Sequence, residues 1–129
     1  MSPLEIVDFR DEVAAVHKAL VARRYRPVNE AAVQKDVAAA LADTGLPVVA
    51  EYPLSSRDRP DFLVADHVAV EVKVRGTTND VLRQLARYAS DPRVAAVVLA
   101  TTVRRLAVAA PTELSGKPIQ VSVLPGAAL

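Results

Sequence analysis

The sequence of 129 residues predicts a single α/β domain in which helices flank a mixed central sheet. Two amphipathic helical segments come first. The middle of the chain then changes to the two-residue alternation that is typical of strands. Another helical segment separates this region from an almost continuous apolar run at residues 94–102, as expected for a strand buried on both faces.

The composition allows a real core and excludes several kinds of chemistry. Apolar residues make up 51% of the chain but aromatic residues only 4%, so alanine and the branched aliphatics must fill the core. The absence of cysteine excludes disulfides, thiol nucleophiles and cysteine-bound metals. The sequence shows no signal-peptide pattern and no apolar run of ~18 residues. We therefore expect a cytoplasmic protein that makes no use of a membrane.

The first helix is expected at about residues 3–24, between Pro3 and Pro27. Its apolar face recurs at three- and four-residue steps: Ile6, Phe9, Val13, Val16 and Leu20. The second helix should follow Asn29, a good N-cap, and end before Gly45 and Pro47. The apolar stripe of this helix is Val33, Val37, Ala40 and Leu41.

Three strands are expected next, at residues 48–54, 61–65 and 67–74, with a polar turn region at residues 55–60. In the third strand the four valines from Val68 to Val74 share one face. The other face carries His67, Ala69, Glu71 and Lys73. Gly76 ends this strand.

A helix is expected from Asn79 to Ser90, with an apolar side of Val81, Leu82, Leu85, Ala86 and Ala89. The apolar strand at residues 94–102 follows it. A helical turn at residues 104–109 and a last strand at about residues 118–124 complete the predicted domain.

The residues most suggestive of chemistry are Asp61 and, after nine intervening residues, Glu71-Val72-Lys73. Hard divalent cations prefer carboxylate oxygens, and they assist phosphodiester hydrolysis. Alternation places Glu71 and Lys73 about 7 Å apart on one face of the strand, with the Val72 carbonyl between them as a further ligand. Such a pair also fits an ordinary solvated face, but here it interrupts a valine-rich strand, where charge is costly unless paired or functional.

The segments Arg59-Pro60-Asp61-Phe62-Leu63-Val64 and Ala69-Val70-Glu71-Val72-Lys73-Val74 resemble the PD-(D/E)XK nuclease superfamily. The resemblance covers residues 29–102 and implies a restriction-endonuclease-like αβββαβ core, here with an extra N-terminal helix. It implies an Mg²⁺- or Mn²⁺-dependent deoxyribonuclease. In such an enzyme Asp61 and Glu71 bind metal and Lys73 positions the attacking water.

Two further features fit the resemblance. Members of the superfamily often add an acidic residue from the first core helix, which makes Glu30 the candidate for a further catalytic and metal-binding residue. Gln84 and Tyr88 lie four residues apart on one helical face. This spacing is similar to the branch that contains RecB-type domains and lambda exonuclease, where the pair helps to place the DNA strand or the lysine. A first-turn Glu favoured by the helix dipole, and a Tyr packed beside a solvated Gln, are the alternative interpretations.

The net charge of +1 excludes nucleic-acid binding by bulk charge, so basic residues must cluster if DNA is the partner. The candidates are Arg57, Arg59, Arg75, Arg83 and Arg87. Arg23, Arg24 and Arg26 form a weaker second patch. His17 and His67 are interpreted as incidental. No glycine-rich phosphate loop or nucleophile elbow indicates an organic cofactor or another reaction.

Three functions remain open on the sequence. The first is an active nuclease, for which the resemblance implies a homodimer as one form and a phage or mobile element as a common setting. The second is a non-catalytic DNA-binding or complex-assembly module that retains the fold. The third is an interaction protein in which the motif is a coincidence.

Overall fold

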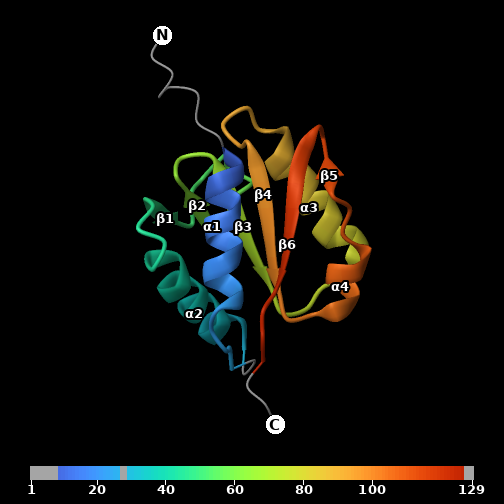
Figure 1. The fold of residues 1–129 in the computed structure, drawn as a ribbon. Coiled ribbons are helices and arrows are strands. Elements are labelled where there is room, and N and C mark those ends of the chain that lie inside the picture. The colour runs from blue at the N-terminus through green and yellow to red at the C-terminus, as the bar shows by residue number, and fades with distance from the viewer. Residues whose placement is uncertain (1–8, 27–28, 127–129) are drawn as a thin grey trace.

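A six-stranded mixed sheet, with the strand order β1-β2-β3-β4-β6-β5, runs between two layers of helices (Figure 1). The computed structural model describes residues 9–26 and 29–126. Helices α1 and α2 cover one face of the sheet, and α3 and α4 cover the other. The predicted α/β class, with a mixed sheet flanked by helices, is confirmed.

Helices α1 (Phe9–Val21) and α2 (Glu30–Ala42) pack their apolar stripes against the sheet. The Asn29 side chain caps α2 by accepting a hydrogen bond from the Ala32 amide at 2.8 Å, as predicted. The expected stripe of α2 is fully buried. The predicted start of the first helix, at residues 3–8, lies outside the described residues.

The strands β1 (Val48–Ala50), β2 (Phe62–Val64) and β3 (Val68–Lys73) form an antiparallel meander. The prediction of a strand from residue 48 to 54 was too long. Glu51 has a φ of 50°, a left-handed conformation that cannot continue a strand, so β1 ends at Ala50. The Glu51 amide still donates to the Asp61 carbonyl at 2.8 Å, which ties this turn to the residue just before β2.

The alternation predicted for β3 is confirmed. Val68, Val70 and Val72 belong to the core under α1 and α2, whereas Ala69 belongs to the core under α3 and α4. Glu71 and Lys73 therefore lie on the α3 side of the sheet, because successive residues of a strand face opposite sides.

Helix α3 (Thr78–Ser90) connects β3 to β4 (Ala96–Thr101), and β3 and β4 pair in parallel. Every residue of β4 is buried, as the apolar run predicted. The turn into α3 depends on Gly76, which has a φ of 125°. A side chain there would also meet Val81 Cγ2 at 3.2 Å. Gly76 thus lets α3 start close against the end of β3.

The chain ends with α4 (Arg104–Ala109), β5 (Glu113–Leu114) and β6 (Lys117–Val123), which pairs in parallel with β4. The two-residue strand β5 was not predicted, because it is too short to show an alternation. Lys117 Nζ donates to the carbonyls of Ala89, Asp91 and Val94 and so holds the C-terminal end of α3. Within the described ranges, none of the helices has both the length and the apolar character needed to cross a membrane.

Candidate active site

The predicted catalytic residues meet at the C-terminal end of β3. Glu71 and Lys73 come from β3 itself, and Asp61 immediately precedes β2, which runs antiparallel to β3. The register pairs Phe62 with Val70, so its next step sets Asp61 opposite Glu71. The short β2–β3 connection therefore brings together two carboxylates that are ten residues apart in the sequence.

Glu71 is the centre of the site, and only 4% of the residue is exposed. Its Oε2 atom lies 3.1 Å from Lys73 Nζ. Its Oε1 atom accepts hydrogen bonds from the Tyr88 hydroxyl at 3.0 Å and from the Asp61 amide at 3.3 Å. Both oxygens of this buried carboxylate are therefore satisfied inside the protein, as a buried charge requires.

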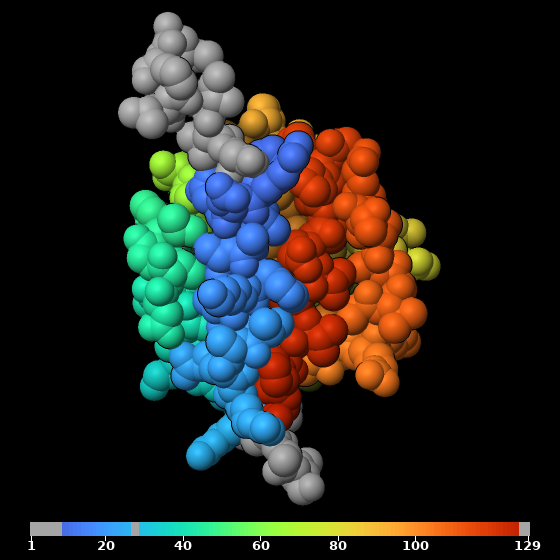
Figure 2. All heavy atoms as spheres, viewed as in Figure 1, coloured from blue at the N-terminus to red at the C-terminus, as the bar shows by residue number. Residues whose placement is uncertain are grey.

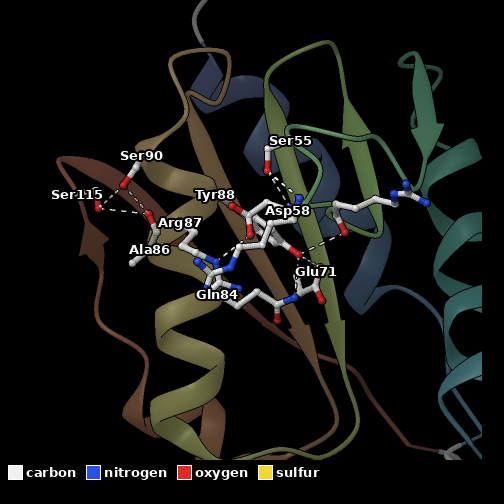
Figure 3. Close-up of polar contacts among 11 residues, drawn as sticks. Ser55, Asp58, Glu71, Gln84, Ala86, Arg87, Tyr88, Ser90 and Ser115 are labelled. Atoms are coloured by element: carbon white, nitrogen blue, oxygen red, sulfur yellow. Dashed lines mark hydrogen bonds and ion pairs between the residues drawn. The ribbon is translucent and has the colours of Figure 1, made fainter.

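Helix α3 supplies a short relay of hydrogen bonds to Glu71 (Figure 3). Gln84 Nε2 donates to the Tyr88 hydroxyl oxygen at 2.9 Å, and that hydroxyl donates to Glu71. Tyr88 is fully buried, in contrast to a tyrosine at a helix edge. The predicted pairing of Gln84 and Tyr88 on one face of α3 thus leads directly to the buried carboxylate.

The Asp61 carboxylate is held from two sides. Its Oδ1 atom accepts from Gln34 Nε2 at 3.1 Å, and its Oδ2 atom accepts from the Val72 amide at 2.8 Å. The amide and carbonyl of one strand residue point to the same neighbouring strand, so the Val72 carbonyl also faces the β2 side. The continued register opposes Val72 to Pro60, which has no N–H to donate to that carbonyl.

The charged forms of both carboxylates are disfavoured in the folded protein. Burial, followed by repulsion from Asp61, raises the pKa of Glu71 from 4.5 to about 7, although Lys73 and Tyr88 oppose the rise. Burial also raises the pKa of Asp61, with a smaller contribution from the charge of Glu30, although the Val72 amide and Lys73 oppose it. A bound cation would relieve both costs.

The donor set suits a hard divalent cation. Within residues 9–26 and 29–126, no three His, Cys, Asp or Glu side chains group closely enough to hold a metal between them. Mg²⁺ is nevertheless commonly held by one or two carboxylates and several waters. Asp61, Glu71 and the Val72 carbonyl supply such oxygens, with Glu30 as a further acidic residue whose charge reaches Asp61.

Gln34 is a site residue that the sequence analysis missed. It lies four residues after Glu30 on α2, which places both on the same helical face. The signal was present in the sequence, because any residue four positions from a candidate metal ligand on a helix is a candidate to face the same site. Its amide contacts Asp61 directly.

The five predicted DNA-binding arginines have different environments. Arg57, Arg59, Arg75 and Arg83 are exposed and form no ion pair with any described residue. Arg87 instead donates through Nε to Asp58 Oδ1 at 2.8 Å (Figure 3). This pair fastens the loop between β1 and β2 to α3, so the structure places Arg87 in a structural contact.

Other polar groups lie away from the two carboxylates. His67 Nε2 contacts Glu12 Oε1 at 2.8 Å at the beginning of β3, and His17 contacts Ser122 at 2.7 Å. A surface hollow of about 230 Å³ lies between α1 and β6, lined in part by Phe9 and Pro118. None of these features includes a predicted site residue.

Comparison of the chain with protein-family models, with curated proteins and with solved structures finds no match.

Proposed function

We propose that this protein is a metal-dependent nuclease that hydrolyses DNA phosphodiester bonds. One observation carries the proposal: Glu71, 4% exposed, is paired with Lys73 and set beside a second carboxylate, Asp61. Two neighbouring carboxylates in a sheet reduce stability. Such a cost is typical of an active site, where charges are positioned for a reaction.

The order of elements supports the proposal. From α2 to β4 the chain forms a helix, a three-stranded antiparallel meander, a helix and a strand parallel to β3. This is the αβββαβ order that the resemblance to PD-(D/E)XK nucleases implies. Asp61, Glu71 and Lys73 lie at the C-terminal end of β3, where an extended phosphate backbone would cross the ends of the strands.

Each residue then has a specific task. A divalent cation held by Asp61, Glu71 and the Val72 carbonyl, with Glu30 nearby, would stabilise negative charge on the phosphate. Lys73, whose side chain is 20% exposed, can reach solvent and orient the attacking water. Tyr88 and Gln84 fix Glu71, and Gln84, which is partly exposed, helps to place the strand. Asp61 and Glu71 keep their positions through the Gln34, Val72 and Tyr88 contacts.

The exposed arginines supply the substrate contacts. Arg57 and Arg59 precede Asp61, Arg75 follows Lys73, and Arg83 lies one residue from Gln84. The planar guanidinium group donates two parallel hydrogen bonds to a phosphate. A few local contacts of this kind reconcile nucleic-acid binding with a net charge of only +1.

One observation favours the alternative, a non-catalytic DNA-binding or complex-assembly module that retains the fold. Every oxygen of Asp61 and Glu71 already accepts a hydrogen bond from this chain. A cation at Asp61 Oδ1 or Glu71 Oε2 would therefore share that oxygen with Gln34 or Lys73. In the alternative, these contacts persist and the site is a structural network.

The test is cleavage of labelled nucleic acid with Mg²⁺ or Mn²⁺ by the wild type and by Lys73→Ala. The substrates are circular single-stranded DNA, linear duplex DNA, branched DNA and an RNA strand. Lys35→Ala, which removes an exposed lysine from α2, is the matched control. We expect cleavage by the wild type and the control, and its loss in folded Lys73→Ala.

The outcomes separate the two functions. Binding without cleavage in every form favours the non-catalytic module. Cleavage that survives in folded Lys73→Ala contradicts the assignment of this site as the source of the activity. Preferred cleavage of one substrate identifies the subtype, and preferred cleavage of RNA corrects the substrate class.

A further inference from the structure

The segment that follows α1 is anchored by a buried tyrosine. Tyr25 is fully buried, its amide donates to the Pro125 carbonyl at 2.7 Å, and its hydroxyl donates to the Leu20 carbonyl at 2.7 Å. It also forms an isolated parallel bridge with Gly126. Tyr25 is therefore held in place by hydrogen bonds from both its main chain and its side chain.

This anchor presents two arginines to solvent. Tyr25 has the extended pairing of a strand, in which neighbouring side chains point away from the one between them. Arg24 and Arg26 are accordingly exposed, and neither forms an ion pair with a described residue. Arg23 differs, because its Nη2 atom lies 3.9 Å from Asp36 Oδ1 on α2.

The arginine pair lies at the same end of the molecule as Asp61 and Glu71. Helix α1 runs in the direction of the parallel strands, because Glu12 contacts His67 at the start of β3 and Tyr25 meets Gly126 beyond the end of β6. Figure 1 shows the end of α1 and the beginning of α2 together at the end of the sheet where β3, β4 and β6 finish. Light-blue atoms that follow α1 project there in Figure 2.

Chain connectivity sets an upper limit on the separation. Four peptide links join Arg26 to Glu30, so their Cα atoms lie no more than about 15 Å apart. The charge of Glu30 acts on Asp61. A nucleic-acid strand with a phosphate at the carboxylates can therefore place a phosphate a few nucleotides away beside Arg26.

We propose that Arg24 and Arg26 form a phosphate-binding track that holds the backbone of the nucleic acid on the α1–α2 side of the catalytic site. The inference rests on the proposed nuclease function and deepens it. The track is assigned to phosphodiester groups, because the planar guanidinium group donates two parallel hydrogen bonds to a phosphate. It also extends the substrate contact beyond the four arginines around Asp61 and Lys73.

The test is binding of fluorescently labelled single-stranded and duplex DNA at several salt concentrations, with Ca²⁺ replacing Mg²⁺. Each phosphate contact contributes about 0.7 to 0.9 to the slope of log affinity against log salt. We expect Arg24→Gln/Arg26→Gln to lower the slope by about 1.5 and to weaken binding about tenfold at low salt. Arg24→Lys/Arg26→Lys should keep the slope. Lys18→Gln, an exposed charge on α1, corrects for the loss of bulk charge.

The outcomes distinguish this inference from the nuclease proposal. A wild type that binds and cleaves, together with a double glutamine variant of unchanged slope and affinity, overturns the track and leaves the nuclease intact. The inference is also overturned if the double glutamine variant loses no more DNA affinity than twice the loss seen for Lys18→Gln. If the wild type binds neither single-stranded nor duplex DNA, both the track and the nuclease proposal are overturned. A lowered slope in the glutamine pair that the lysine pair restores establishes the track.

Discussion

The charged form of the Glu71 carboxylate is stabilised by its contacts but destabilised by its buried position beside Asp61. Lys73 and Tyr88 stabilise its charged form, yet burial and Asp61 destabilise that form more strongly, and the pKa rises to about 7. The folded protein therefore binds a proton at Glu71 more tightly than the unfolded chain does, for which the ordinary pKa is 4.5. This difference makes the stability depend on pH.

The sign follows from proton binding. Between pH 4.5 and about 7 the folded state holds more protons at Glu71, so the free energy of unfolding falls as pH rises through this window. A tenfold change in proton affinity is worth about 1.4 kcal/mol, so the loss is on the order of 3 kcal/mol. Chemical denaturation at a series of pH values should show it. Glu71→Gln should flatten the profile, whereas Glu113→Gln, an exposed control, should not. An equally steep profile in Glu71→Gln would refute this origin.

Gln34 gives a second prediction at the scale of one residue. Its amide stabilises the charged form of Asp61 and so lowers the pKa of that carboxyl. Gln34→Leu should raise the pKa of Asp61 further, which carboxyl-carbon NMR titration measures directly. Gln120→Leu, a substitution on β6, should leave the Asp61 titration as in the wild type. An unchanged Asp61 titration in Gln34→Leu would mean that the contact is absent in solution.

Helix α3 carries two arginines, one of which is expected to contribute to stability and the other to DNA binding. Arg87 pairs with Asp58, whose side chain is 17% exposed, whereas Arg83 is exposed and unpaired among the described residues. Arg87→Gln should reduce stability by about 1 kcal/mol, and Asp58→Asn should reduce it similarly. The double variant should lose less than the sum. Arg83→Gln should leave stability unchanged and weaken DNA binding. Additive losses in the double variant would exclude a coupled pair.

The elements that the sequence predicted well are those with a regular or unbroken pattern of apolar residues. The two faces of β3, the stripe of α2 and the fully buried β4 all follow from apolar patterning. Patterning could not show where β1 ends, since a left-handed Glu51 stops it, or that two residues form β5. Local sequence carries no sign that Glu51 ends β1, whereas Ser115-Gly116 is a turn signal between β5 and β6 that the sequence analysis did not use.

The candidate site was predicted in part. Sequence spacing placed Glu71 and Lys73 on one face, and the meander brought Asp61 beside them. The partner of Arg87 could not be predicted, because Asp58 lies 29 residues away and on another element.

At the scale of the whole molecule, charge is distributed unevenly although the net charge is only +1. Exposed arginines, including Arg24, Arg26 and Arg75, lie toward the ends of the parallel strands where the carboxylates meet. Asp11, in the first turn of α1, and Asp66, between β2 and β3, are exposed at the opposite end, whereas Glu51 and Asp80 are exposed at the same end as the carboxylates. A molecule of this kind should orient a phosphate backbone toward one end.

A pair of substitutions separates this distribution from net charge. Arg75→Gln/Asp66→Asn keeps the net charge but removes one cation near Lys73 and one anion at the other end of β3, about 20 Å away. That distance exceeds the Debye length of about 10 Å at 0.1 M salt, so Asp66→Asn alone should leave DNA affinity unchanged. Asparagine also tolerates the left-handed φ of 67° at this turn.

Fluorescence anisotropy at 0.1 M salt, with Ca²⁺ replacing Mg²⁺, should therefore show weaker DNA binding for Arg75→Gln/Asp66→Asn and no change for Asp66→Asn alone. If bulk charge governed binding, the pair would bind as the wild type does and Asp66→Asn would bind more tightly. The comparison does not depend on cleavage. It therefore tests whether one end of this nearly neutral protein is built to receive a phosphate backbone, whether or not Lys73 activates a water there.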